Sequence, residues 1–162
     1  MAVDPRTSVT IVRKELEDCQ KDAIRNHWEI SPIDEQNQIF TVKMKSPIDN
    51  QEYIIEIKFD NYKELPLYIE FIDPTTGEKG TKNAYPSSKG KTIFFHGLPC
   101  ICHPCSRKVY REAYTNGPHT DWTLTGWQQN PQVGSLTNIR AILLAIYSRI
   151  SNEEEYGGRM RA

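Results

Sequence analysis

Hydrophobic residues recur at spacings of three and four near the N-terminus of this 162-residue chain, with charged residues between them. The hydrophobic positions are Val9, Val12, Leu16, Cys19 and Ala23. This spacing places their side chains on one face of an α-helix, and we therefore predict a helix over residues 8–26 with Ser8 as its cap. Because Cys19 falls on the apolar face, we interpret it as a core residue.

The next part of the chain alternates between hydrophobic and polar residues with a period of two. The alternation runs through three segments, 40–44, 55–59 and 67–71. It is typical of β-strands with one buried face. The connectors 46–50 and 60–64 are short and rich in turn-forming residues, so consecutive strands should pair antiparallel as a meander.

The second half of the chain has weaker periodicity. Residues 73–91 predict a long surface loop, and 91–96 predict a further strand. Residues 106–134 are irregular, although Trp122 and Trp127 must pack somewhere. A hydrophobic stripe then predicts a closing helix over 136–150, capped by Ser135 or Thr137.

The order of elements indicates one α+β domain over residues 1–162, with an antiparallel meander of about four strands flanked by helices. We expect residues 151–162 to form a mobile tail. Hydrophobic residues make up 38% of the chain and charged residues 25%, which is a globular composition.

Charge and hydropathy exclude several classes of partner. The formal net charge is −1, and no basic block stands out, so we expect no nucleic-acid partner. No hydrophobic run approaches the roughly 20 residues that span a bilayer, and the N-terminus lacks the layout of a signal peptide. We therefore expect a cytoplasmic protein without a membrane partner, whose four cysteines are free thiols, metal ligands or catalytic groups.

The candidate chemistry is concentrated in residues 96–105. Three of the four cysteines and two of the four histidines lie there, directly after the predicted strand. Such a cluster predicts either a metal site or a nucleophilic thiol whose neighbours tune its reactivity.

Two stretches resemble the ubiquitin-conjugating enzyme family. Residues 59–71 look like that family's turn between its second and third strands, with an aromatic strand end, a Tyr and a Pro. Pro99-Cys100-Ile101-Cys102 resembles its active-site segment, and Trp127 with the following helix resembles its Trp and next helix. The resemblance covers roughly residues 8–150.

The family's His-Pro-Asn triplet is absent from its expected place. His96-Gly97-Leu98 stands near that place, and His103-Pro104-Cys105 follows the candidate nucleophile. With the long insertion before the cysteines, the chain is more similar to divergent bacterial members. These belong to operons for ubiquitin-like conjugation or for the anti-phage defence called CBASS.

The resemblance implies a transferase that forms a cysteine thioester with a partner's C-terminus and passes the acyl group to an amine. The implied partner is the cGAS-like nucleotidyltransferase (CD-NTase) of a CBASS operon or a ubiquitin-like protein, together with an activating enzyme. No cofactor is expected.

The residues leave the identity of the nucleophile open between Cys102 and Cys100. His96, His103, Arg107 or Lys108 would supply the positive potential that favours a thiolate. Transfer to an amine also requires donors to the oxyanion, either backbone N–H groups or the side chains of Asn116 or His119.

Two alternatives remain at this stage. Thiolate and imidazole ligands suit zinc, and a zinc-stabilised interaction module would use Cys100, Cys102, Cys105 and one of His96, His103 or His119. A conjugating-enzyme-like domain without activity, which only binds a ubiquitin-like tail, is the second alternative.

Overall fold

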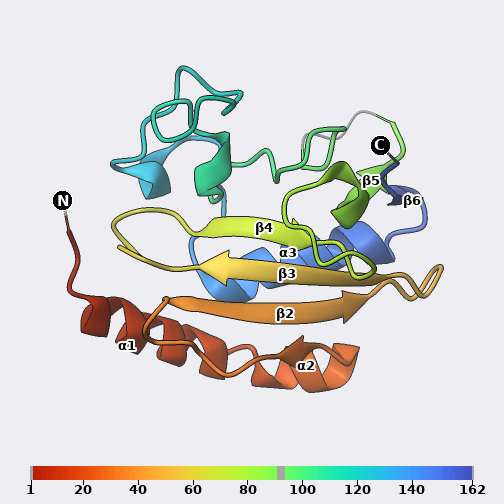
Figure 1. Cartoon of the computed structure of the whole chain (residues 1–162), viewed down its shortest axis with the longest axis horizontal. Coiled ribbons are helices and arrows are strands. Elements are labelled where there is room, and N and C mark those ends of the chain that lie inside the picture. The colour runs from red at the N-terminus through yellow and green to blue at the C-terminus, as the bar shows by residue number, and fades with distance from the viewer. Residues whose placement is uncertain (1, 91–93, 162) are drawn as a thin grey trace.

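The computed structural model describes residues 2–90 and 94–161, and a four-stranded antiparallel sheet forms its centre (Figure 1). The strands follow chain order across the sheet: β1 (Glu29–Ile30), β2 (Ile39–Lys45), β3 (Glu52–Lys58) and β4 (Tyr68–Ile72). The α+β class and the antiparallel meander predicted from the sequence are confirmed.

The predicted alternation sets which face of the sheet is buried. In the register, Phe40 lies opposite Ile57, and Val42 lies opposite Ile55. These four side chains are almost completely buried, whereas Lys43 on the opposite face is exposed. Figure 1 shows α3 (Ile139–Ser151) behind the sheet and the N-terminal helices along its β2 side.

The fourth strand is β1, which differs from the prediction of a strand over 91–96. Residues 91–93 lie outside the described residues, and 94–96 form bends. Phe94 and Phe95 are consecutive, yet both are buried, 2% and 1% exposed. An extended strand would point them to opposite sides, so the bend allows both rings to enter the core.

The predicted N-terminal helix is two helices, α1 (Pro5–Glu17) and α2 (Gln20–Asn26). The cap is Asp4, whose carboxylate accepts the N–H of Arg6, and not Ser8. The buried Ser8 hydroxyl instead donates to the carbonyl of Tyr62 at 2.7 Å. Asp4 before Pro5 is a strong start signal, because Pro suits the first helical position.

The closing helix α3 begins later than predicted. Its cap is Asn138, whose side chain accepts the N–H of Ala141 at 2.9 Å, and neither Ser135 nor Thr137 takes this role. The end at Ser151 agrees with the sequence. Arg140 of α3 donates to the buried Asp22 of α2 at 2.7 Å, which ties the two helices together.

The predicted loop before the cysteines and the predicted tail form structure that the sequence did not predict. Strand β5 (Pro86–Ser88), which follows the 3-10 helix η1 (Lys82–Ala84), pairs antiparallel with β6 (Tyr156–Arg159). The ring of Tyr85 stacks on Phe71, with centroids 4.6 Å apart. The Tyr156 and Tyr53 hydroxyls lie 2.6 Å apart. The expected surface loop and mobile tail are therefore wrong in part, because buried aromatic side chains anchor both segments to the core.

None of the helices in the described part of the chain is both long and apolar enough to cross a membrane.

Candidate functional site

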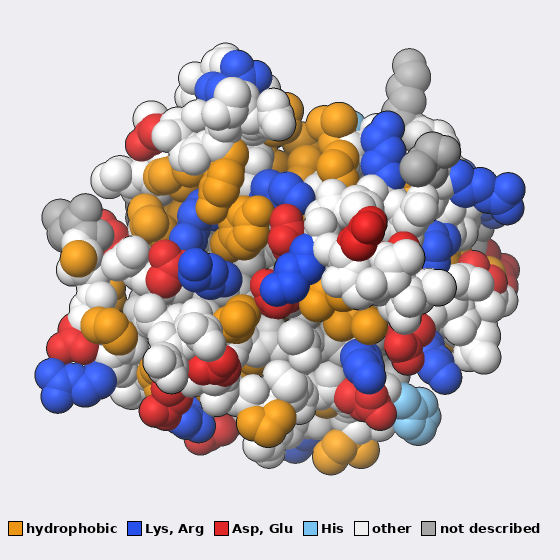
Figure 2. All heavy atoms as spheres, in the orientation of Figure 1, with side chains coloured by type: hydrophobic (Ala, Val, Ile, Leu, Met, Phe, Trp, Pro, Cys, Tyr) orange, Lys and Arg blue, Asp and Glu red, His pale blue; other side chains and the backbone are white. Residues whose placement is uncertain are grey.

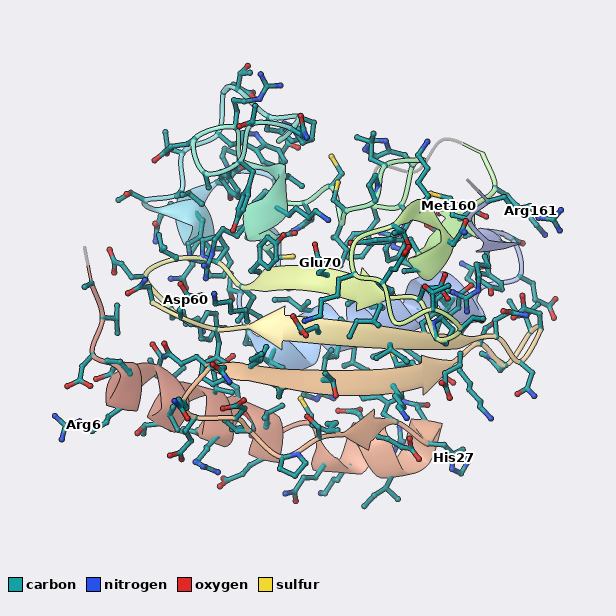
Figure 3. All side chains as sticks on the ribbon, viewed as in Figure 1. Arg6, His27, Asp60, Glu70, Met160 and Arg161 are labelled. Carbon is teal, nitrogen blue, oxygen red and sulfur yellow. The ribbon has the colours of Figure 1, made fainter. Side chains whose placement is uncertain are left out.

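The cysteine-bearing chain crosses above β4 as an irregular layer that includes η2 (Arg107–Val109) and η3 (Trp127–Gln129) (Figure 1). Arg107 fixes this layer to the sheet. Its guanidinium donates to the Pro66 carbonyl, to the Asp60 carboxylate and to the Asp60 carbonyl, at 2.9, 2.9 and 2.8 Å. Figure 3 labels Asp60 in the turn after β3. Arg107 therefore has a structural role and is not the free cation that the sequence suggested.

Two aromatic side chains hold the rest of the layer. The Trp127 indole N–H donates to the Lys63 carbonyl at 3.1 Å, and the Tyr110 hydroxyl donates to the Pro104 carbonyl at 2.6 Å. Trp122 and Trp127 are 8% and 1% exposed, which confirms that both pack. The irregular layer is thus held to the rest of the protein by side-chain hydrogen bonds of Tyr110 and Trp127 instead of a continuous backbone ladder.

The central contact of the site joins Cys102 to His119. The sulfur of Cys102 lies 3.2 Å from Nε2 of His119, and 17 positions separate them in the sequence. His119 is brought there by a short bridge: its N–H donates to the Val109 carbonyl, and the Arg111 N–H donates to the His119 carbonyl, both at 3.0 Å. Gly117 permits this approach, since a Cβ there would lie 2.5 Å from the carbonyl carbon of Tyr110.

The imidazole of His119 is held on two further sides. Its ring is parallel to Trp122 within 1°, with centroids 3.5 Å apart. Its Nδ1 lies 3.6 Å from a carboxylate oxygen of Asp121, whose side chain is 76% exposed. This separation is an ion-pair contact and too long for a hydrogen bond. A carboxylate beside Nδ1 favours the proton on that nitrogen, which leaves Nε2 as the base facing Cys102.

The four thiols differ in their partners. Burial raises the pKa of Cys19 to about 12 and that of Cys100 to about 11, with the charge of Cys102 adding to the second shift. Burial also raises the pKa of Cys105 and of Cys102. Among the described thiols, Cys102 alone contacts an imidazole, so it has a base within reach.

The two histidines that the sequence placed beside the nucleophile make no thiol contact among the described residues. Nδ1 of His103 accepts the N–H of Cys105 at 3.1 Å. Burial, helped by the nearby charge of Arg149, lowers the His103 pKa to about 4, so this ring is neutral at pH 7. His96 is exposed, and no contact to a thiol is found for it in the described part of the chain. Among the described residues, the imidazole that contacts the Cys102 sulfur is that of His119.

The remaining candidates also separate. The ammonium of Lys108 pairs with Glu70 at 3.0 Å. Its charge offsets only part of the rise that burial causes in the pKa of Cys100. Asn116 lines a cavity with Cys100. Two backbone N–H groups at the candidate nucleophile are already used: Cys102 donates to Phe94, and His103 donates to Ile101. No oxyanion donor is therefore assigned.

The alternative zinc ligands Cys100, Cys102, Cys105 and His119 do not converge. Among residues 2–90 and 94–161, no group of three or more His, Cys, Asp or Glu side chains is arranged to hold a metal ion. Cys105 is completely buried, whereas Cys102 turns toward His119.

Sequence reasoning named His119 only as a metal ligand or an oxyanion donor, and it missed Asp121. The signal available was the short run His119-Thr120-Asp121-Trp122, which holds a base, a carboxylate and a large ring. Nothing local connects that run to Cys102.

The chain matches no family model, no curated protein and no solved structure. The likeness to conjugating enzymes therefore depends on the residues and the order of elements alone.

Proposed function

We propose that this protein is a conjugating-enzyme-like acyl carrier in which Cys102 accepts the C-terminal acyl group of a partner protein as a thioester. The observation that carries the proposal is the 3.2 Å contact between the Cys102 sulfur and Nε2 of His119. Further support comes from the order of elements, in which helices and an antiparallel meander precede the cysteine segment and one helix follows it.

The contact supplies the first chemical step. Because burial raises the pKa of Cys102, the thiol is largely protonated at neutral pH, and only the thiolate is a good nucleophile. His119 accepts the proton as the sulfur attacks the acyl carbon of an incoming thioester. The bond from that carbon to the leaving sulfur then breaks, and the imidazolium returns the proton to the leaving thiolate.

In the transfer of the acyl group, Cys102 changes from the nucleophile to the leaving group. An amine attacks the thioester carbon, the new carbon–nitrogen bond forms, and the bond to Cys102 breaks. His119 takes a proton from the attacking nitrogen, and the sulfur leaves as a thiolate. Asp121 contacts Nδ1, the ring nitrogen that does not face the sulfur, and so helps to orient the imidazole in both steps.

The partners proposed are those that the resemblance implies. They are the C-terminus of a CBASS nucleotidyltransferase or of a ubiquitin-like protein, with an activating enzyme as the source of the thioester. The proposed setting is the bacterial cytoplasm. The inactive binding module is disfavoured because a domain that only binds a tail has no need of a base beside its thiol.

The first experiment uses the purified chain and a peptide α-thioester with a mercaptoethanesulfonate leaving group. Intact-mass spectrometry under non-reducing conditions should show the acyl mass on the protein, removable by dithiothreitol. Cys102→Ser should abolish the adduct or replace it with a thiol-resistant oxyester. Cys100→Ser and Cys19→Ser are matched controls that should keep the labile adduct.

Addition of a primary amine should convert the adduct to an amide and restore free Cys102. A labile adduct that persists in Cys102→Ser would overturn the assignment, and so would the absence of any adduct on the unmodified chain. Release of free acid at the same rate with and without the amine would instead indicate a thiol hydrolase.

The second experiment identifies the donor. The chain is expressed with its neighbouring genes, and Cys102→Ser is used to trap an oxyester for mass spectrometry. The proposal expects the trapped mass to end in the C-terminal peptide of one of those gene products.

A further inference from the structure

A cavity of about 620 Å³ lies beside the Cys100 thiol, within the range of about 300–1,000 Å³ that is usual for ligand sites. One wall consists of residues 98–100, and another consists of Tyr114, Thr115, Asn116 and Pro118. In Figure 2, hydrophobic side chains gather on the part of this face above the sheet, among Lys and Arg side chains.

The cavity walls are mainly apolar. Leu98 is one of the exposed large hydrophobic residues of the described chain, with 39% of its surface accessible. Pro99 and Pro118 add two rigid apolar surfaces, and Tyr114 is fixed by a ring contact to Tyr68 at 5.1 Å. The Cys100 thiol, with its pKa raised to about 11, is uncharged at pH 7.

The charge that reaches the cavity is already compensated. Lys108 pairs with Glu70 at 3.0 Å, and the same carboxylate oxygen accepts the Tyr68 hydroxyl at 3.0 Å. Figure 3 labels Glu70, the partner of Lys108 in this ion pair, on β4. Gly80 leaves room for the pair, since a Cβ there would lie 2.7 Å from the Glu70 oxygen.

Each wall contains a residue that is close in sequence to one of the two residues of the Cys102–His119 contact. Cys100 precedes Cys102 by two residues, and Pro118 directly precedes His119. Since an extended chain advances about 3.3 Å per residue, a donor whose terminal carbon is at Cys102 would place one of its preceding residues near the Cys100 wall. A lysine acceptor suits the cavity poorly, because the nearby carboxylate of Glu70 is already paired with Lys108. The exposed carboxylate of Asp121 lies on the His119 side instead.

We propose that this cavity binds a large apolar side chain, of the Leu or Phe class, from the last few residues of the acyl donor. The inference rests on the proposed function, because the donor must reach Cys102 as a thioester. It predicts slower reaction of donors whose last residues are all Gly, and of donors with an acidic residue next to the terminal residue. Burying an unpaired carboxylate among apolar walls is unfavourable.

The test compares peptide α-thioesters that differ only in the residue before a terminal Gly: Leu, Phe, Gly or Glu. The rate of Cys102 acylation is followed by intact mass. The Leu and Phe peptides should react at least about tenfold faster than the Gly and Glu peptides, a typical discrimination by an apolar pocket.

Leu98→Asp should reduce the Leu-to-Gly rate ratio to near one, and Leu98→Ser serves as an uncharged check. The matched control is Ile48→Asp, because Ile48 is similarly exposed, at 42%, in the β2–β3 turn. It should leave the ratio unchanged. Thermal melts establish that all three variants fold.

Equal rates for all four peptides would overturn this inference and leave the proposed function standing. So would a Leu preference that survives Leu98→Asp and Leu98→Ser. Failure of every peptide to acylate Cys102 would overturn the proposed function and this inference together.

Discussion

The β2–β4 meander and the irregular layer above it are built by different kinds of interaction. Continuous backbone ladders with consecutive registers join the three strands. In the layer, by contrast, side-chain hydrogen bonds from Arg107, Tyr110 and Trp127 hold a chain whose regular structure is limited to 3-10 turns and isolated bridges. The meander is thus stabilised redundantly, whereas the layer depends on a few side chains.

This difference explains why the candidate site is in the layer. A strand ladder holds side chains on two faces at fixed spacings, so it does not turn a thiol and an imidazole toward each other at 3.2 Å as this layer does. An irregular chain can, provided that a rigid scaffold supports it. The division predicts that changes in the layer alter reactivity, and that changes in the meander alter only stability.

The largest expected effect tests the pair itself. His119→Gln should lower the rate of Cys102 acylation by about 10²–10⁴-fold, because the thiol loses its base. Intact mass with a peptide thioester measures the rate. His96→Gln is the matched control and should leave the rate unchanged, since His96 is exposed. A rate for His119→Gln within about twofold of the unmodified chain would exclude His119 as the base.

The next effect tests the anchor of the layer. Arg107→Met should lower the free energy of unfolding by about 2–4 kcal/mol, because it leaves Asp60 without its buried partner. Urea unfolding measures this loss, and acylation of Cys102 should also slow. Arg6→Met removes an exposed arginine that pairs with Asp4, and its unfolding midpoint should not change. If the two variants unfold alike, the anchor has been misassigned.

A smaller effect depends on pH. The folded-state pKa of His103, about 4, lies below the ordinary value of 6.5, so the unfolded chain binds more protons between these values. Stability should therefore be fully present above pH 6.5 and be lost as pH falls toward 4, with this residue accounting for about 1–3 kcal/mol.

Thermal or urea unfolding at pH 7 and pH 4.5 checks this dependence. His103→Asn should lose less stability on acidification than the unmodified chain, because Asn does not take up a proton. His96→Asn serves as the matched control at an exposed ring, and it should lose as much stability on acidification as the unmodified chain. Identical pH dependence in all three proteins would refute the role of His103.

The smallest effect is expected from the meander. Ile55→Val removes one methylene from a completely buried position of β3 and should cost about 0.5–1.5 kcal/mol of unfolding free energy. The rate of Cys102 acylation, measured well below the unfolding midpoint, should not change. A slower rate would show that the two regions are coupled more closely than their bonding suggests.

The sequence by itself determined the meander and the helical pattern. The alternation through Phe40, Val42 and Met44 reports directly which side of a strand is buried, because side chains in a strand change sides at every residue. Helix ends were less certain, since Asp4 and Asn138, the residues that cap the helices, lie outside the hydrophobic stripes. The cysteine cluster was also recognisable as the candidate site.

Only the tertiary structure decided which groups meet there. The pairing of β5 with β6 joins residues as far apart as Ser87 and Gly158, which are separated by 71 positions. Cys102 likewise finds His119 through a bridge to Val109 and the close approach of Gly117. Such contacts depend on the path of an irregular backbone, which has no period. A local pattern therefore identifies the cysteine cluster, but it does not show which cysteine contacts an imidazole or which histidine supplies it.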